Sequence, residues 1–327
     1  MQRCVLPILL ASAVFARAQA IPSPDAAPQA AVTNAPRPVA RPAPDLSIIF
    51  TAVTTRGTAV PALLPGDCRA EVQGRQLPLR ELTPLGKQPR TFALLLNTAG
   101  SQQTVFAAEQ QAASAIADRL RPQDEAMLLA FDTDITLLSD FTAHRAALEA
   151  VIHSAPMNAS VGHFTTGTLP PIGKVDGALL YDAMHLGIQR LKDEAGRRVL
   201  VVIGNGVDQG SRTHLRHVIR EAQRAQVTID GLLVRDVTLD DMLEASGKGS
   251  MRQLVQATGG EMFPVDARGK GLKPAITQLE LQLDAGWRGV LPVDATAPGK
   301  AEPLRLTCQH NGRALKMHVP KAVSAPR

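Results

Sequence analysis

FALLLNTAGS, residues 92–101, is the stretch that decides the fold. Its first five residues are all apolar, which is typical of a strand buried on both faces of a parallel sheet. The polar residues after it mark the carboxyl end of the strand, where sheets of this kind bind their ligands. Apolar residues then recur at helical spacing over residues 105–120, and Pro122 ends the pattern. We therefore predict a strand followed directly by a helix.

The same alternation of strand and helix continues to residue 283. Short apolar runs predict strands, and apolar residues at a period of 3.6 predict helices. The expected strands are 126–131, 135–138, 199–203 and 227–234, and the expected helices are 143–152, 180–191, 215–222, 249–257 and 272–283. Strands that alternate with helices indicate an α/β fold with a central, mostly parallel sheet flanked by helices.

Both flanks of this region have β patterns. Residues 46–88 contain short strands between Gly and Pro turns, and residues 285–320 contain a hairpin pattern around Asn311-Gly312. We expect the two flanks to pair with each other as a small β-module. The α/β domain, residues 89–284, would then be inserted between them.

The N-terminus has the pattern of a secretory signal. Arg3 precedes an apolar stretch, residues 4–15, that is too short to span a membrane, and small residues follow it up to Ala20. The alternative interpretation is a short membrane anchor. We expect a signal peptide over residues 1–20 and a Pro/Ala-rich linker over residues 21–45. The mature chain would be secreted or periplasmic, without a membrane span.

Composition argues against nucleic acid as a partner. The 327 residues carry a net charge of +5, which falls to +3 when the two arginines of the signal are removed, and the basic residues form no stripe. Only 3% of the residues are aromatic, too few for a base-stacking surface. We therefore expect no nucleic-acid partner.

Two cysteines, Cys68 and Cys308, remain after removal of the signal. In an oxidising compartment they could form one long-range disulfide between the two β flanks, and the alternative is a pair of buried free thiols. A disulfide there would close a loop of about 240 residues and stabilise the fold by roughly 5 kcal/mol at most in the chain-entropy model.

The sequence contains no motif of a known catalytic chemistry. It has no G-x-S-x-G, P-loop or HExxH pattern, and the glycines around Asn205 lack dinucleotide-binding spacing. His214 and His217 lie three residues apart on a predicted helix, but no carboxylate stands at a convincing spacing, so we expect two solvated side chains. We expect a protein that is not an enzyme, with an uncharacterised hydrolase as the weaker alternative.

Three segments together resemble a von Willebrand factor type A (vWA) domain. They are LLLNTAGS at 94–101, GALLYDA at 177–183 and VVIGNGVD at 201–208, and the likeness extends over about residues 46–320. More specifically, the chain resembles the VWFA-related domain of secreted acidobacterial-type proteins. The resemblance implies a Rossmann-like vWA fold and a function in adhesion or protein–protein interaction.

In this family the three segments form a metal-ion-dependent adhesion site (MIDAS), which holds a divalent cation through carboxylate and hydroxyl oxygens. Here Asn97 replaces the first Asp, Ala99 a Ser, Ala178 the Thr and Asn205 the last Asp, and Ser101 alone is retained. Both carboxylates have become neutral amides. The resemblance therefore implies a degenerate MIDAS without a cofactor, that is, without Mg²⁺ or another divalent cation.

The remaining polar positions of these loops are predicted to have structural roles. We interpret Asn97 and Asn205 as amides that bridge the strand-end loops, with residual metal binding as the alternative. Thr98 belongs to the same binding surface, and Asp208 is expected to cap a helix that starts near residues 211–213.

The expected function is protein binding through the loops at 97–102, 160–178 and 204–212, with a partner that the sequence does not name. The alternative is a structural or scaffold protein whose strand-end face is inert. In that case the β-module would dock the partner.

Overall fold

The computed structural model describes residues 46–157, 177–235, 241–292 and 301–324. The expected signal and linker, and most of the loop expected at 160–178, lie outside these ranges. Within them, no helix combines the length and the apolar character that crossing a membrane requires.

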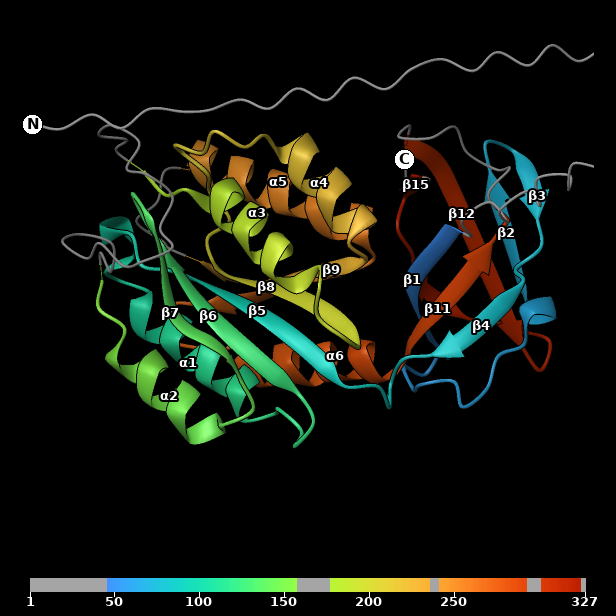
Figure 1. The fold of residues 1–327 in the computed structure, drawn as a ribbon, viewed down its shortest axis with the longest axis horizontal. Helices are drawn as coiled ribbons and strands as arrows, with labels where there is room; N and C mark the ends of the chain where they lie inside the picture. The colour runs from blue at the N-terminus through green and yellow to red at the C-terminus, as the bar shows by residue number, and fades with distance from the viewer. Residues whose placement is uncertain (1–45, 158–176, 236–240, 293–300, 325–327) are drawn as a thin grey trace, which may run out of the picture. The chain divides into compact units, whose positions relative to one another are not determined.

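A six-stranded sheet forms the centre of the α/β domain (Figure 1). Its strands are β5 (Arg90–Asn97), β6 (Glu125–Phe131), β7 (Ile135–Thr142), β8 (Arg197–Gly204), β9 (Val227–Arg235) and β10 (Met262–Asp266). The order is β10-β9-β8-β5-β6-β7, and every neighbouring pair is parallel except β6 and β7. The expected Rossmann-like architecture is therefore confirmed.

Helices cover both faces of this sheet (Figure 1). One face carries α1 (Phe106–Ala117), α2 (Arg145–Ser154) and α6 (Leu272–Asp284), and the other carries α3 (Leu180–Leu191), α4 (Leu215–Arg224) and α5 (Asp241–Thr258). Strand β5 supplies both cores, because successive side chains of a strand point to opposite faces. Leu94 and Leu96 pack with the first helix group, and Ala93 and Leu95 pack with the second.

The β flanks pair with each other, as expected from the sequence. One sheet, in the order β14-β1-β11-β4, contains β1 (Leu46–Val53), β4 (Glu81–Pro84), β11 (Gly286–Leu291) and β14 (Lys316–His318). The other contains β2 (Cys68–Val72), β3 (Arg75–Leu77), β12 (Ala301–His310), β13 (Arg313–Ala314) and β15 (Ala322–Ser324). Antiparallel pairing of β1 with β11 and of β2 with β12 joins the two flanks, and apolar side chains from both sheets form a third core.

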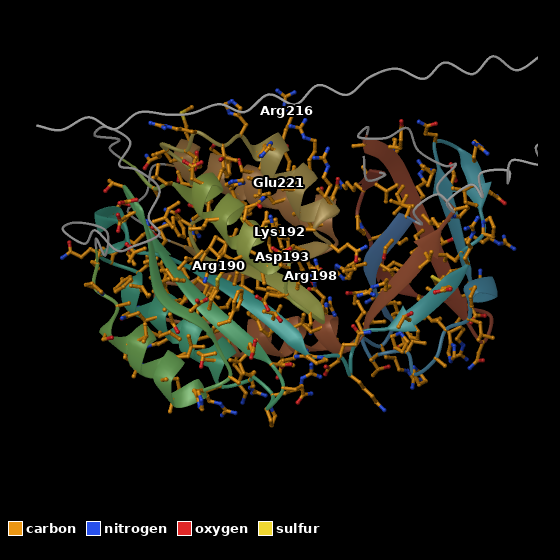
Figure 2. The ribbon with its side chains drawn as sticks, in the orientation of Figure 1. Arg190, Lys192, Asp193, Arg198, Arg216 and Glu221 are labelled. Atoms are coloured by element: carbon orange, nitrogen blue, oxygen red, sulfur yellow. A yellow bond between two sulfur atoms is a disulfide. The ribbon has the colours of Figure 1, made fainter. Side chains whose placement is uncertain are left out.

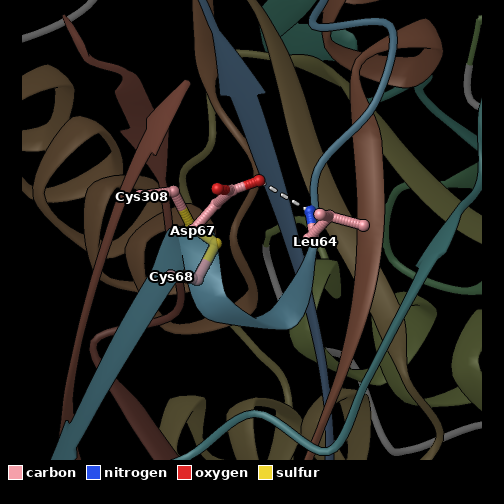
Figure 3. Close-up of a disulfide and its surroundings, with 4 residues drawn as sticks. All are labelled: Leu64, Asp67, Cys68 and Cys308. Carbon is pink, nitrogen blue, oxygen red and sulfur yellow. Dashed lines mark hydrogen bonds between the residues drawn. A yellow bond between two sulfur atoms is a disulfide. The ribbon is translucent and has the colours of Figure 1, made fainter. Parts of the chain in front are cut away.

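A disulfide joins Cys68 to Cys308 (Figure 3). The two residues stand directly opposite each other in the pairing of β2 with β12, and their side chains are buried. A short 3₁₀ turn, Pro65–Asp67, leads into β2, and a carboxylate oxygen of Asp67 accepts a hydrogen bond from the backbone N–H of Leu64 at 2.8 Å. Of the two interpretations of the cysteines, the disulfide is confirmed.

Three elements differ most from the sequence-based prediction. Strand β10 was not predicted, because it is a short edge strand that contains Pro264. Helix α5 begins at Asp241 rather than at residue 249, since its glycines lower helix propensity without preventing the helix. The predicted C-terminal hairpin forms around Asn311-Gly312, but its second arm then leaves the sheet, and β14 pairs with β1.

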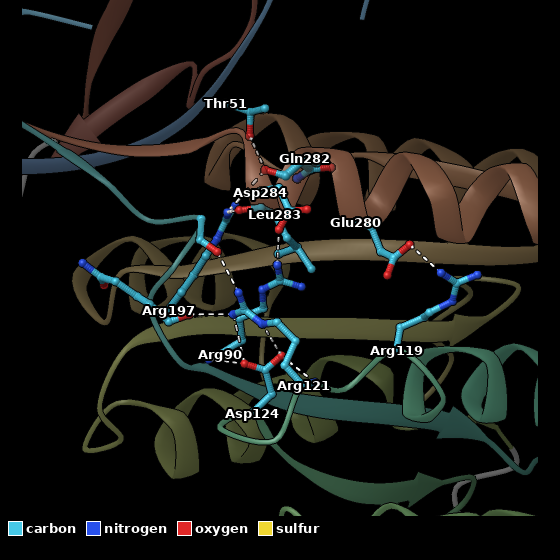
Figure 4. A network of polar contacts seen from close by, with 12 residues as sticks. Thr51, Arg90, Arg119, Arg121, Asp124, Arg197, Glu280, Gln282, Leu283 and Asp284 are labelled. Carbon is cyan, nitrogen blue, oxygen red and sulfur yellow. Dashed lines mark hydrogen bonds and ion pairs between the residues drawn. The ribbon is translucent and has the colours of Figure 1, made fainter. Parts of the chain in front are cut away.

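A buried arginine stands at the amino-terminal edge of the central sheet (Figure 4). The Arg197 guanidinium donates hydrogen bonds to the carbonyl oxygens of Leu283, at 2.5 Å, and Gln282, at 3.3 Å, at the end of α6. Helix ends leave carbonyl groups without intrahelical partners, so this cation satisfies them. The Thr51 hydroxyl of β1 donates to the same Gln282 carbonyl at 3.3 Å. The contact therefore ties the β-module to the α/β domain.

A buried carboxyl group lies beside this arginine. Asp230 of β9 is fully buried, and one of its oxygens accepts hydrogen bonds from the backbone N–H of Glu261 at 2.8 Å and the Gln282 side chain at 3.0 Å. Burial raises the pKa of Asp230 to about 6, and burial lowers the pKa of Arg197 to about 10. The charge of each opposes the effect of burial on the other.

Candidate functional site

The MIDAS-like positions lie at the carboxyl edge of the central sheet. Strands β5 and β8 are neighbours there, with Leu96 opposite Ile203. Asn97 is the last residue of β5 and Asn205 comes directly after β8, so the two asparagines lie at adjacent strand ends. The chain leaves β5 for β6 on one side, whereas β8 lies on the other side. The edge between β5 and β8 is therefore the topological switch point, where open α/β sheets bind their ligands.

Both asparagine side chains are engaged by their own loops. The Asn97 amide oxygen accepts a hydrogen bond from the backbone N–H of Ala99 at 3.1 Å, and the Asn205 amide oxygen accepts one from that of Val207 at 3.0 Å. Both residues are buried. This is the local turn geometry that Asn favours. We expected these amides to bridge different loops. Their oxygens instead accept hydrogen bonds within their own loops, so the expectation is wrong for these contacts.

Thr98 joins two strand-end loops. Its hydroxyl is completely buried and donates to a carboxylate oxygen of Asp132 at 2.7 Å, just beyond β6. The other carboxylate oxygen of Asp132 accepts the backbone N–H of Asp134 at 3.2 Å. Asp132 therefore connects the loop after β5 with the loop after β6.

The other MIDAS-like positions offer little oxygen chemistry. Ala99 and Ala178 have methyl side chains, and Ala178 is buried. Ser101 is exposed, and its hydroxyl accepts a hydrogen bond from the Gln102 side chain at 3.2 Å. Among the MIDAS-like positions, the Ser101 hydroxyl is thus the polar group that is accessible to solvent.

Asp208 anchors the start of α3. One of its carboxylate oxygens accepts the backbone N–H of Tyr181 at 3.1 Å and the hydroxyl of Ser211 at 2.5 Å. Burial raises the pKa of Asp208 above its ordinary value, and the nearby charge of Asp182 adds to this effect. The prediction that Asp208 caps a helix starting near residues 211–213 is wrong. The next helix, α4, begins at Leu215, and the helix whose backbone N–H donates to Asp208 is α3.

A glycine contact brings α5 against the loop after β8. Gly206 adopts a positive φ of 77°, which other residues rarely adopt. A Cβ at Gly247 of α5 would stand 2.8 Å from the carbonyl oxygen of Asn205. Only a glycine allows the helix to approach this closely, so α5 directly supports the Asn205 loop.

A hollow of about 440 Å³ opens beside Asn205. Leu233 of β9 and Met262 and Pro264 of β10 give it apolar walls. Charged side chains also line it, and they are Arg235, Glu244 and Lys248. Arg235 and Glu244 form an ion pair at 3.4 Å, whereas Lys248 is exposed. The sequence does not predict this hollow, because the pattern of β10, which forms part of its wall, does not indicate a strand.

A second polar cluster lies on α3 and α4. His217 stands 3.3 Å from a carboxylate oxygen of Glu221, one turn further along α4, and His185 of α3 reaches the other oxygen. His217 is exposed, as expected, but the expectation that no carboxylate stands at a suitable spacing from it is wrong. The spacing of four residues between His217 and Glu221 was the available signal, since such residues share a helix face. His185 is brought in only by the packing of two helices.

No family model and no curated protein matches the sequence. Solved structures with a similar fold include BatB from Bacteroides thetaiotaomicron, at 15% identity over 58% of this chain and 96% of that chain, with a TM-score of 0.45. A von Willebrand factor type A protein from Catenulispora acidiphila is similar at 10% identity over 86% of this chain and 74% of that chain, with a TM-score of 0.47. Proximal thread matrix protein 1 from the mussel byssus is similar at 11% identity over 65% of this chain and 49% of that chain, with a TM-score of 0.45.

These similarities transfer no residue role to this chain. The architecture stands on the chain's own topology, in which a parallel sheet with one antiparallel edge strand carries helices on both faces. By that arrangement the chain has a Rossmann-like α/β fold.

Proposed function

We propose that this chain is a secreted vWA-type module that binds a protein partner through the carboxyl edge of its central sheet, without a metal ion. The observation that carries the proposal is the engagement of the Asn97 and Asn205 amide oxygens by their own loops. The edge keeps the position of a ligand site, but its contacts with a partner would be hydrogen bonds and apolar packing. No catalytic step is part of this function.

The donor set at this edge does not fit a hard divalent cation. Such an ion requires several oxygen ligands with carboxylate charge. Asn97 and Asn205 are neutral, Ala99 and Ala178 have no side-chain oxygen, and the Asp208 carboxylate is held by α3 and its own loop. Partner recognition is therefore proposed to depend on shape and hydrogen bonding.

The hollow beside Asn205 supports a protein as the partner. Its apolar walls suit a buried side chain of a partner, and the exposed Lys248 at its border suits an acidic neighbour of that side chain. Gln209 is also exposed and follows Asn205 in the loop after β8, and its backbone N–H donates to the carbonyl oxygen of Ala178, just before α3, at 3.1 Å. A docked segment would thus contact Asn205, Lys248 and Gln209 together.

Export is the second part of the proposal. The Cys68–Cys308 disulfide is typical of proteins that fold outside the cytoplasm. Mass spectrometry of the exported protein should identify Ile21 as its first residue. An unprocessed N-terminus on exported protein would contradict the proposed signal peptide.

A photo-crosslinker at Gln209 tests the partner-binding face. We expect it to capture a protein that a crosslinker at Arg69 of the β-module does not capture. The captured protein, once purified, should bind the wild type and lose affinity for Lys248→Glu and Asn205→Arg. The matched variant Arg69→Glu, also a charge reversal at an exposed site, should bind normally. Loss of binding in Arg69→Glu alone would favour the alternative of a docking β-module with an inert strand edge.

Metal titration tests the proposed loss of the cation. Calorimetric titration of the mature protein with Mg²⁺ or Mn²⁺ should give no binding that depends on Asn205. A quadruple variant, Asn97→Asp, Ala99→Ser, Ala178→Thr and Asn205→Asp, restores the family's ligands and is the positive control. Micromolar binding by the wild type that disappears in Asn205→Ala would overturn the proposal.

A further inference from the structure

A cluster of two histidines and one glutamate lies on the outer surface of α3 and α4. Nδ1 of His185 is 2.6 Å from one carboxylate oxygen of Glu221, and Nε2 of His217 is 3.3 Å from the other. One ligand atom from each residue lies within 4.8 Å of the other two. Glu221 stands on α4, where that helix packs beside α3 (Figure 2). The cluster shares no residue with the strand-end site.

The backbone holds these side chains in place. His217 and Glu221 are one helical turn apart on α4, so their side chains lie on the same face. Under them, Val218 and Ala222 of α4 pack into the same buried core as Met184 of α3. The two helices are therefore fixed relative to each other, and the three ligand atoms converge without a flexible loop.

A second layer orients the carboxylate. The Gln189 side chain donates a hydrogen bond to the Glu221 oxygen that faces His217, at 2.9 Å, and Lys192 donates to the Gln189 amide oxygen at 2.9 Å. Glu221 is only 14% exposed, whereas His185 and His217 are 33% and 48% exposed. The carboxylate is thus largely shielded from water, and the imidazoles remain reachable for an ion. Outer contacts of this kind orient ligands in known metal sites.

We propose that His185, His217 and Glu221 bind a divalent transition-metal ion of the Zn²⁺ type. Two imidazoles and one carboxylate are a common three-ligand set for zinc, with a fourth position left for water. Zinc holds such ligands at about 2.0–2.2 Å, which puts them roughly 3.3 Å apart in a tetrahedron. The 3.3 Å separation of His217 from Glu221 matches that value, and the 2.6 Å separation of His185 from Glu221 is shorter, so small side-chain rotations suffice. Mg²⁺ and Ca²⁺ prefer oxygen ligands and are not expected to bind here.

The competing explanation is a hydrogen-bonded bridge. In that case Glu221 would link two imidazoles across the helices and would stabilise their packing without any ion. Variants would then change the stability of the metal-free protein but would have no effect on metal binding. A zinc titration separates the two explanations.

Zn²⁺ titration of the metal-stripped full chain is the test. We expect one ion per chain with micromolar affinity, and an increase in unfolding temperature when Zn²⁺ is added. His185→Ala, His217→Ala and Glu221→Gln should each weaken binding by about tenfold or more. His214→Ala is the matched control, because His214 is exposed three residues before His217 and lies outside the cluster, and it should bind as the wild type does. Co²⁺ in place of Zn²⁺ should give the intense visible absorption of a tetrahedral site.

Circular dichroism and thermal unfolding without metal verify that each variant is folded. Glu221→Gln keeps the size and hydrogen-bonding capacity of the side chain, so it remains informative if the alanine variants are unstable. The proposal is overturned if the folded wild type binds no Zn²⁺, if all three cluster variants bind it unchanged, or if His214→Ala abolishes binding. Asn205→Ala should leave Zn²⁺ binding intact, so failure here is distinguishable from failure of the proposed strand-edge function.

Discussion

Asp182 and Asp208 each hold the segment that carries the other. The Asp182 carboxylate, in the first turn of α3, accepts the backbone N–H groups of Arg212 and Thr213 at 2.9 Å and 2.8 Å. Asp208, in the loop after β8, accepts the backbone N–H of Tyr181 at the start of α3. The two strand-end segments of the proposed binding face are therefore held together by reciprocal hydrogen bonds.

Removal of the Asp182 carboxylate should weaken this connection. Asp182→Ala leaves two backbone N–H groups near α4 without an acceptor, at a cost of about 1–3 kcal/mol each when buried. We expect a lower free energy of unfolding in urea and faster amide hydrogen exchange over residues 205–213. Asp182→Asn, which keeps one acceptor oxygen, should lie between the wild type and Asp182→Ala. Unchanged exchange in Asp182→Ala would contradict the reciprocal arrangement.

The disulfide should contribute strongly to stability. Replacement of both Cys68 and Cys308 by Ser releases a loop with a sequence separation of 240 residues in the unfolded chain. The chain-entropy model predicts a loss of up to roughly 5 kcal/mol, measured as the free energy of unfolding in urea. Dithiothreitol should destabilise the wild type and have no effect on the double variant. Equal stability of the oxidised and reduced wild type would contradict this expectation.

Asp230 should make stability fall as the pH rises. Its pKa is raised from 3.8 to about 6 in the folded state, so the folded state binds the proton more tightly than the unfolded state does. The resulting stabilisation is fully present below about pH 4 and is lost as the pH rises through about 6, by an amount on the order of 3 kcal/mol. Asp230→Asn keeps an acceptor oxygen and cannot ionise. The difference in unfolding free energy, wild type minus Asp230→Asn, should therefore decrease between pH 4 and pH 7.

Arg197 should determine the upper limit of the pH range in which stability falls. Its positive charge lowers the pKa of Asp230, against the larger effect of burial. In Arg197→Met the carboxyl group keeps its burial and loses the cation, so its pKa should rise above 6. The pH range over which stability falls should therefore extend upward, and the total loss should be larger, in urea-unfolding series. The same variant leaves the Leu283 carbonyl without its buried donor, so we also expect a lower stability at every pH.

The fold could be predicted from the sequence because its central strands carry a strong signal. The five apolar residues of β5 pack into the cores on both faces of the sheet. A strand that is buried on both faces needs apolar residues at every position, and the sequence therefore shows an uninterrupted apolar run. Strand β10 carries no such signal. It lies at the edge of the sheet, contains a proline and pairs with β9 alone, so neighbours in space determine it more than its own residues do.

The site was predictable in position but not in its contacts. The order of strand ends placed Asn97 and Asn205 at one edge, because parallel strands align their carboxyl ends. The partners of Asp182 and Asp208 depend on loops about 30 residues apart in the chain. The triad of His185, His217 and Glu221 likewise requires the packing of two helices. Local spacing contains no information about such contacts, except for His217 and Glu221.

The position of the disulfide also determines how the chain bears tension. A pull on the segment before β1 and on the segment after β15 reaches the Cys68–Cys308 bond from both sides. The covalent bond then carries the load, and the 239 residues between the two cysteines, which include the whole α/β domain, bear none of it. Under stretching, the β-module would open at β1 and at the strands after Cys308, β13 to β15, while the proposed partner-binding face stays folded. In a reducing solution the same pull would pass through the central sheet.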